Sequence, residues 1–242
     1  MRTVAVIQAR MGSSRLPGKS MLCLHGRPLI DWVVERTRRA RLLDDVVVAC
    51  PDTRLDDALA FHLSELPVRV VRGSEDDVLG RFVLAARETK ADQVVRICAD
   101  NPFVWWEAID RLVRFHAESG ADCSYNHIPK GNLWPDGLGA EIVSADLLEQ
   151  LAAKAKDPSE REHCLNYLWN HREDYAMATF DPEEQWLKRP DIRLDVDTIE
   201  DFVNVSELTA SLFEEAEELV TSYDAVCALN AWGFKAAGNK EN

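Results

Sequence analysis

The sequence predicts an α/β fold in which helices cover both faces of a mostly parallel β-sheet. Two observations predict it. Short apolar runs rich in β-branched residues alternate with longer amphipathic segments through the first 120 residues, which is typical of strands buried on both faces. The 242 residues are 46% hydrophobic, enough for one sizeable core, and they contain no internal repeat or low-complexity linker. We therefore expect a single domain spanning residues 1–242.

The first half of the chain supplies the regular part of this alternation. Buried strands are expected at four apolar runs, 3–9, 45–50, 68–71 and 93–98. The amphipathic segments that follow them predict helices at about 28–41, 53–65, 76–90 and 105–119. The first helix has Pro28 in its first turn, where the missing N–H is tolerated. Trp105 and Trp106 are expected to pack in the core.

After about residue 121 the alternation becomes irregular. Strands are expected at 122–126, 137–143, 175–180 and 192–197. Helices are expected near 145–156 and 159–173, and the acidic stretch from residue 198 is expected to be helical up to a frayed end. We interpret residues 1–120 as one half of the domain, about 121–190 as a small lobe, and 191–242 as a last strand with C-terminal helices.

Composition excludes several classes of function. The net charge of −14 argues against broad binding to nucleic acid or to an anionic membrane. The first residues lack the apolar core of a signal peptide, and no stretch approaches transmembrane length. Six scattered cysteines without a CxxC pair are interpreted as reduced thiols, which indicates a cytoplasmic protein without a zinc site.

The segment QARMGSSRLPGKS, residues 8–20, is a candidate phosphate-binding loop. It resembles a Walker P-loop, but five residues rather than four separate Gly12 from Gly18. The segment follows the first predicted strand, at the edge where open α/β sheets bind ligands. Its cations and its small residues suit a polyphosphate; they are Arg10, Gly12, Ser13, Ser14, Arg15 and Lys19. A solvated polar loop is the alternative.

Two further segments carry carboxylates that could hold a metal. Asp100 ends the predicted strand in RICADNPF, at the same sheet edge as the loop. An Asp at that place can cap a helix, but Mg²⁺ also takes one or two carboxylates together with phosphate oxygens, and we favour the metal ligand. In DIRLDVDT, a period of two places Arg193, Asp195 and Asp197 on one strand face. We favour Asp197 as a second metal ligand over a strand edge in which Arg193 balances the charge.

Three softer signals complete the set. Asp77 and Arg81 are four apart on a predicted helix and could form a surface ion pair. Glu141 interrupts an apolar strand after a glycine turn. Ser159 and Glu162 stand in capping-box register, and His163 follows directly, with structural and functional interpretations equally open.

Taken together, these segments resemble one family. They are similar, in the same order and over nearly the whole chain, to the cytidylyltransferase family of spore-coat polysaccharide biosynthesis protein F, more distantly related to CMP-Kdo and CMP-sialate synthetases. The segments are IQARMGSSRLPGK, RGSEDDVLGRF, RICADNPF, PDGLGAEIV, SEREH and RLDVDTIEDF.

The resemblance implies a GT-A-like nucleotidyltransferase fold that uses CTP and Mg²⁺, with nucleotide binding in residues 1–120 and acceptor binding and dimerisation in the lobe. The implied nucleotide-binding residues are Ala9, Arg10, Met11, Gly12, Ser13, Ser14, Arg15, Lys19, Asp77, Arg81 and Asp100. The implied metal ligands are Asp100 and Asp197, and with Arg15 and Lys19 they form the expected catalytic set. The implied acceptor-binding residues are Asn101, Glu141, Arg161, His163 and Asp195.

The expected reaction transfers CMP to a small anionic acceptor, an acidic sugar or a phosphorylated or phosphonate compound, and releases pyrophosphate. Three departures from the family pattern lie in the acceptor half: Asp195 in place of a small hydroxyl residue, CLNYLW in place of a Val-Thr-Pro-Tyr-like segment, and Gly139-Ala140 where relatives carry an acid. The acceptor therefore stays open. A GT-A glycosyltransferase and a non-catalytic nucleotide-binding protein are the alternatives, and a homodimer is expected.

Overall fold

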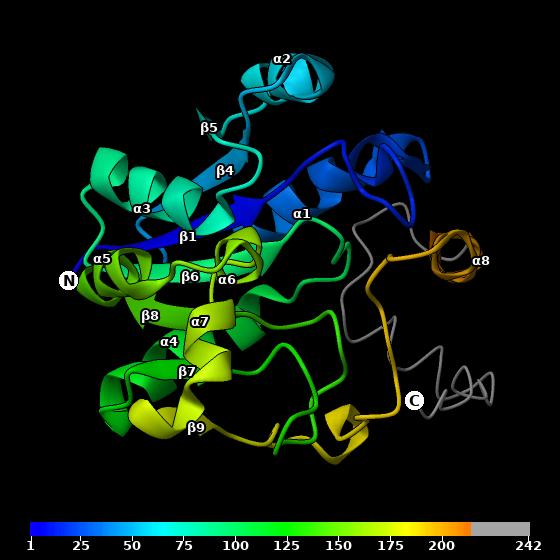
Figure 1. The fold of residues 1–242 in the computed structure, drawn as a ribbon. Helices are drawn as coiled ribbons and strands as arrows, with labels where there is room; N and C mark the ends of the chain where they lie inside the picture. Colours follow the sequence, from blue (N-terminus) through cyan, green and yellow to red (C-terminus); the bar gives the residue numbers. More distant parts are fainter. Residues whose placement is uncertain (214–242) are drawn as a thin grey trace.

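A seven-stranded mixed β-sheet organises the molecule, as shown by a computed structural model that describes residues 1–213 (Figure 1). The strand order is β5-β4-β1-β6-β8-β7-β9. Strands β1, β4, β5 and β6 are parallel, β8 runs antiparallel to β6 and β7, and β9 is parallel to β7. The strands are β1 Thr3–Gln8, β4 Asp45–Pro51, β5 Arg69–Gly73, β6 Gln93–Cys98, β7 Cys123–Tyr125, β8 Glu141–Ser144 and β9 Met177–Thr179.

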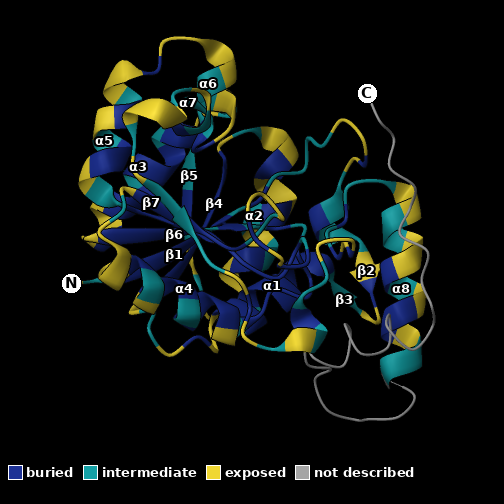
Figure 2. Ribbon diagram, turned by 90° about the horizontal axis from the view of Figure 1, so that it is seen from below, coloured by how far each residue is buried: buried dark blue, intermediate teal, exposed yellow. Residues whose placement is uncertain are grey.

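Helices pack on both faces of the sheet, so the central strands are buried throughout (Figure 2). Successive side chains of β1 alternate: Ala5 and Ile7 pack with α1 and α4, whereas Val4 and Val6 pack with α3 and α5. This two-sided burial explains the continuous apolar runs of the parallel strands. The helices are α1 Leu29–Thr37, α2 Asp57–Ser64, α3 Val78–Thr89, α4 Trp106–Ser119, α5 Ala145–Lys154, α6 Pro158–Glu162, α7 Asn166–Asn170 and α8 Ile199–Phe213.

In the first half, the predicted order of strands and helices is confirmed. Trp105 is buried as expected, and Trp106 packs against the same core. The first helix is shorter than predicted at both ends. Pro28 belongs to a small hairpin, β2 Cys23–Leu24 with β3 Arg27–Pro28, and α1 ends at Thr37. The chain after α1 is held by Asp110, whose carboxylate accepts hydrogen bonds from the N–H groups of Arg41 and Leu42.

The helix predicted at 159–173 is wrong as a single element. The chain forms α6 and α7, with an extended His163 between them, and the break buries Cys164 and Leu165 against α3 and α5. The capping box of Ser159 and Glu162 is wrong as well. Asp157 caps α6 by accepting from the N–H of Ser159, because an Asp before a proline at the first helical position is the stronger start signal.

The segment 192–197 is extended but is not a strand of the sheet. Its alternation is real, since Ile192, Leu194 and Val196 are buried. Its pairing, however, is limited to one bridge between Asp136 and Arg193. The backbone hydrogen bonds that a neighbouring strand would make go instead to loops, with the N–H of Leu194 bonded to the carbonyl of Asp136. The segment leads into α8.

The remaining expectations concern the chain ends and membranes. The helices and frayed end expected beyond residue 213 lie outside the described residues. Within residues 1–213, none of the helices has both the length and the apolar character needed to cross a membrane. The five cysteines of this part of the chain are free thiols.

Candidate active site

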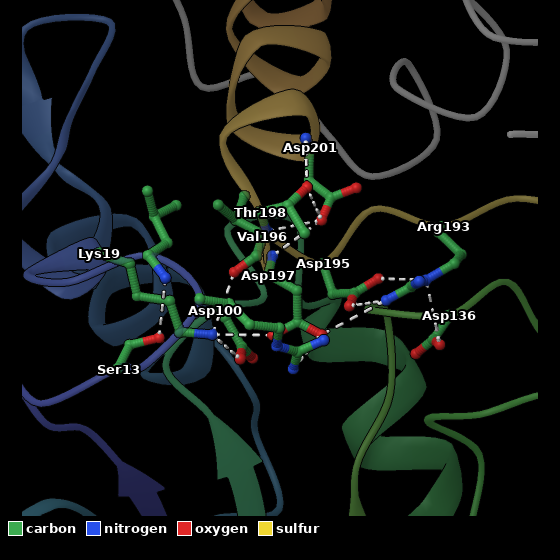
Figure 3. Close-up of polar contacts among 12 residues, drawn as sticks. Ser13, Lys19, Asp100, Asp136, Arg193, Asp195, Val196, Asp197, Thr198 and Asp201 are labelled. Atoms are coloured by element: carbon green, nitrogen blue, oxygen red, sulfur yellow. Dashed lines mark hydrogen bonds and ion pairs between the residues drawn. The ribbon is translucent and has the colours of Figure 1, made fainter.

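The loop after β1 is held in shape by its backbone. The N–H of Met11 donates to Asp56 at the start of α2 at 2.8 Å, and the carbonyl of Met11 accepts from the N–H of Gly18 at 2.9 Å. Gly18 has a φ of 73°, a left-handed conformation that suits glycine, and Ser20 Oγ donates to the carbonyl of Arg10. The loop is therefore closed on itself, and the side chain of Lys19 reaches the carboxyl edge of the sheet (Figure 3).

The Lys19 ammonium joins three oxygen atoms from distant parts of the chain. Its Nζ lies 2.6 Å from Asp100 Oδ2, 3.0 Å from Asp197 Oδ1 and 3.1 Å from the carbonyl oxygen of Val196 (Figure 3). Burial lowers the pKa of Lys19, but the two carboxylates raise it more, so its net pKa lies above the ordinary value. Burial conversely raises the pKa of Asp197, and the cations around it bring the net pKa below the ordinary value.

Local structure fixes both carboxylates. Asp100 follows β6, and its carbonyl accepts the N–H of Val196 at 2.8 Å, which ties the two segments together. Asp197 lies two residues before α8. The N–H groups of Asp197 and Thr198 donate to Asp201 Oδ2 at 3.1 and 2.8 Å, an arrangement that holds the start of the helix. The sequence prediction that Asp100 and Asp197 lie together is thus matched by the geometry.

Two arginines flank Asp197 from opposite ends of the chain. Arg15 Nη2 lies 2.9 Å from Asp197 Oδ2, and Arg193 Nη2 lies 3.5 Å from the same oxygen. Arg193 is held by a two-point contact with Asp195, whose pKa is raised by burial despite that contact (Figure 3). The expected common face of Arg193, Asp195 and Asp197 is therefore present, although the segment is no strand.

Asp136 is a member of this cluster that the sequence interpretation missed. Its carboxylate lies 3.9 Å from Arg193 Nε, and burial, reinforced by the charge of Asp195, raises the pKa of Asp136 to about 7. Gly137 makes the approach possible: its φ is 90°, and a Cβ there would lie 2.8 Å from the Asp195 nitrogen. The Asp-Gly turn after a proline was the signal for a backbone contact of this kind.

The predicted pair of Asp77 and Arg81 does not form. Asp77 caps α3 through the N–H of Gly80 and pairs with Arg161 Nη2 at 2.5 Å. Arg81 is 1% exposed and donates to the carbonyls of Ser74 and Glu75, while burial and then the charge of Arg10 lower its pKa. One oxygen of Asp77 caps the helix and the other pairs with Arg161, while Arg81 donates to backbone carbonyls, so the spacing of four does not produce an ion pair between them. Arg161 also donates to two carbonyls near the end of α5 and thereby connects α3 to α5.

Glu141 lies in a second buried polar cluster. It pairs with Arg96 across the β6–β8 contact and accepts from Trp169 Nε1 at 2.7 Å. His127 Nε2 is 3.9 Å away. Burial raises the pKa of Glu141, but these neighbours lower it further, so the net pKa lies below the ordinary value. The described contacts of Glu141 include neither Arg161 nor the exposed His163, and sequence inspection missed Arg96, His127 and Trp169.

The mixed sheet, with a cationic loop after its first strand and two acids facing it, has the architecture of a nucleotidyltransferase. A cytidylyltransferase of Leptospira borgpetersenii superimposes with a TM-score of 0.83 and 27% identity over 96% of this chain and 95% of that one. A CMP:2-keto-3-deoxy-manno-octonic acid synthetase complexed with CTP shares the fold at a TM-score of 0.64 and 19% identity, covering 87% of this chain and 99% of that one.

The chain belongs to the cytidylyltransferase family, whose model matches residues 4–232. It is 35% identical over 225 residues to the spore coat polysaccharide biosynthesis protein SpsF of Bacillus subtilis. The aligned region covers 89% of this chain and 91% of the relative. The predicted GT-A-like nucleotidyltransferase fold and family resemblance are confirmed, and the protein is a nucleotidyltransferase.

Proposed function

We propose that the protein transfers CMP from CTP to a small anionic acceptor and releases pyrophosphate, in the biosynthesis of a surface polysaccharide or a related compound. The observation that carries the proposal is the convergence of Arg15 and Lys19, from the loop after β1, on Asp100 and Asp197. Family membership supports CMP transfer, and the name of the Bacillus subtilis relative, a spore coat polysaccharide biosynthesis protein, supports the polysaccharide context.

In this reaction an acceptor oxygen attacks the α-phosphorus of CTP, and the bond to the β-phosphate oxygen breaks as pyrophosphate leaves. No protein nucleophile is needed, so the protein contributes positioning and electrostatic stabilisation. Arg15 and Lys19 hold negative phosphate oxygens and offset the charge that grows on the leaving pyrophosphate. We assign Arg193, on the other side of Asp197, to the acceptor side of the site.

The acidic side of the cluster fits a divalent cation. Asp100, Asp197 and the Val196 carbonyl present the oxygen donors that Mg²⁺ prefers, and a lysine ammonium already lies among them. Asp100 and Asp197 would hold the ion, which supplies charge neutralisation to the triphosphate when bound. The two chain segments that carry these ligands are hydrogen-bonded to each other, so the donors are held in place before any ion binds.

The remaining assignments are part of the same proposal. Ala9, Met11, Gly12, Ser13 and Ser14 offer backbone and hydroxyl groups to the nucleotide, with Arg10, Asp77 and Arg81 beside them. Acceptor contacts are assigned to the end of β6, to the lobe and to the 192–197 segment, at Asn101, Glu141, Arg161, His163 and Asp195. A cytoplasmic homodimer is the proposed working form. The free thiols support the cytoplasmic compartment, because disulfides are rare there.

The test is pyrophosphate release by the purified protein with Mg²⁺, each of the four nucleoside triphosphates and a panel of acidic sugars, sugar phosphates and phosphonates. We expect release with CTP and one acceptor class. Asp100→Asn and Asp197→Asn should each reduce kcat by about 10²-fold or more, because each removes a carboxylate ligand of the divalent ion that would offset transition-state charge. Asp191→Asn is the matched control, since Asp191 pairs with Arg189 on the surface.

Three results would contradict the proposal. Near-wild-type turnover in both site variants would remove the metal assignment. Binding of CTP without pyrophosphate release on any acceptor would favour a nucleotide-binding protein without catalysis. Transfer of a sugar from a nucleotide sugar, with no pyrophosphate, would favour a glycosyltransferase.

A further inference from the structure

Three oxygen atoms form a preformed cradle for a cation: Asp100 Oδ2, the Val196 carbonyl oxygen and Asp197 Oδ1 (Figure 3). The hydrogen bond from the Val196 N–H to the Asp100 carbonyl joins its two sides. Asp201 fixes the Asp197 backbone at the start of α8. The backbone that carries these three oxygens is thus held independently of the occupant of the cradle.

In this structure the occupant is the ammonium of Lys19, at 2.6, 3.1 and 3.0 Å from the three oxygens. A divalent ion that used the same oxygens, at the shorter distances of about 2.1 Å that Mg²⁺ takes, would have to stand in the ammonium's place. The charge balance of the cradle also indicates that the ammonium and a divalent ion exclude each other. Lys19 and Arg15 together bring two positive charges to the two carboxylates, so the cradle is already neutralised.

The lysine can leave without moving the loop. The backbone around Lys19 is held by the Ser20 Oγ bond to the Arg10 carbonyl and by the Met21 N–H bond to the Gly18 carbonyl. Only the four-carbon side chain has to rotate to carry the ammonium to another anion. A triphosphate bound at the loop is such an anion, and it matches the mobile point charge of a lysine.

We propose that Lys19 fills the divalent-cation cradle in the nucleotide-free protein and yields it only when a triphosphate draws the ammonium away. The cradle then has a third ligand beyond the two carboxylates, the carbonyl oxygen of Val196. The inference rests on the proposed function, because it takes the loop to bind a nucleoside triphosphate. Its consequence is that metal and nucleotide bind together: each raises the affinity of the other, by the reciprocity of linked equilibria.

The test measures binding of Mn²⁺ alone to the full-length protein, without nucleotide, from the spin-resonance signal of the free ion at pH 7.5. Wild-type protein should bind Mn²⁺ weakly. Lys19→Met should bind it about tenfold more tightly or better, because a positive charge beside a divalent ion is removed. Lys19→Gln serves as a second uncharged variant, and circular dichroism checks that both are folded. Lys156→Met, at an exposed lysine between α5 and α6, should match wild type.

The double variant Lys19→Met with Asp100→Asn should lose the gain. Equal Mn²⁺ affinity in wild type and both Lys19 variants would overturn the inference, and so would a gain that survives in the double variant. These results do not involve turnover. Pyrophosphate release by the wild-type protein reports separately on the proposed function, so the two can fail independently.

Discussion

Arg193 shows how one side chain can set the position of another. Its guanidinium is anchored by Asp195 and reaches Asp197 Oδ2 at 3.5 Å, with Asp136 on its far side. The same Arg-x-Asp pattern occurs four residues earlier, where Arg189 contacts Asp191 at the surface. The chain therefore contains an internal comparison between an arginine at the site and one away from it.

We expect Arg193→Met to lower kcat/KM for pyrophosphate release about tenfold, because Asp197 loses a cation that orients it and the acceptor side loses a positive charge. Arg189→Met should stay within twofold of wild type. Steady-state kinetics with CTP and the acceptor found in the screen provide the measurement. Equal effects of the two substitutions would show that Arg193 has no role of its own at the site.

His127 makes stability depend on pH. Burial lowers its pKa to about 4, from an ordinary value of about 6.5. The unfolded chain therefore binds more protons than the folded chain between these values, and folded stability falls as pH drops from about 6.5 to 4. Facing groups include Glu141, which raises this pKa, and Arg96 and Lys130, which lower it.

Between pH 7 and pH 4.5 the free energy of unfolding should therefore fall by about 1–3 kcal/mol less in His127→Gln than in wild type. Urea denaturation at four or five pH values measures it. His163→Gln, at an exposed site, is the control and should leave the slope unchanged. An identical slope in wild type and His127→Gln would contradict the assignment.

At the scale of elements, the contact between the 126–140 loop and the 192–197 segment holds the acidic side of the site. The N–H of Asp136 bonds to the carbonyl of Ile192, and the N–H of Leu194 bonds back to Asp136. Gly137 lies against the Asp195 backbone with a φ of 90°. Any side chain at residue 137 meets that backbone, which cannot move without shifting Asp195 and Asp197.

Gly137→Ala should therefore cost about 2–3 kcal/mol of stability, from left-handed strain and collision together. Gly120→Ala separates the two causes, because Gly120 has a φ of 66° but nothing within 4 Å of its would-be Cβ; we expect about 1 kcal/mol there. Chemical denaturation gives both values. A cost at Gly137 no larger than at Gly120 would show that the neighbouring backbone yields easily.

The same scale explains what could be predicted from the sequence. The first-half strands were predictable because burial on both faces imposes continuous β-branched runs, and parallel strands place Lys19 and Asp100 at one edge. The break at His163 and the loop pairing of 192–197 were not predictable, because tertiary contacts decide them. Asp136 was missed for that reason too, because its contacts with Ile192 and Arg193 join parts of the chain that are far apart in sequence.

For the whole molecule, charge is distributed unevenly. The chain carries a net charge of −14, yet the loop after β1 carries three cations within a short stretch of sequence, Arg10, Arg15 and Lys19. The net negative charge of the chain disfavours a polyanion and the local cations favour it, so we expect a triphosphate to bind at this loop rather than elsewhere on the surface. A divalent ion bound with the nucleotide would reduce the repulsion further.

The strand order has a consequence for the growing chain. β8 lies between β6 and β7 although it is synthesised after both, and Lys19 meets Asp197 across 178 residues. A nascent polypeptide that has emerged only as far as β7 has its loop and Asp100, but neither the strand that fills the sheet nor the second carboxylate. If the proposed site binds CTP, ribosome-bound intermediates of that length are expected to be incompetent for it, and we expect competence only after Asp197 has emerged.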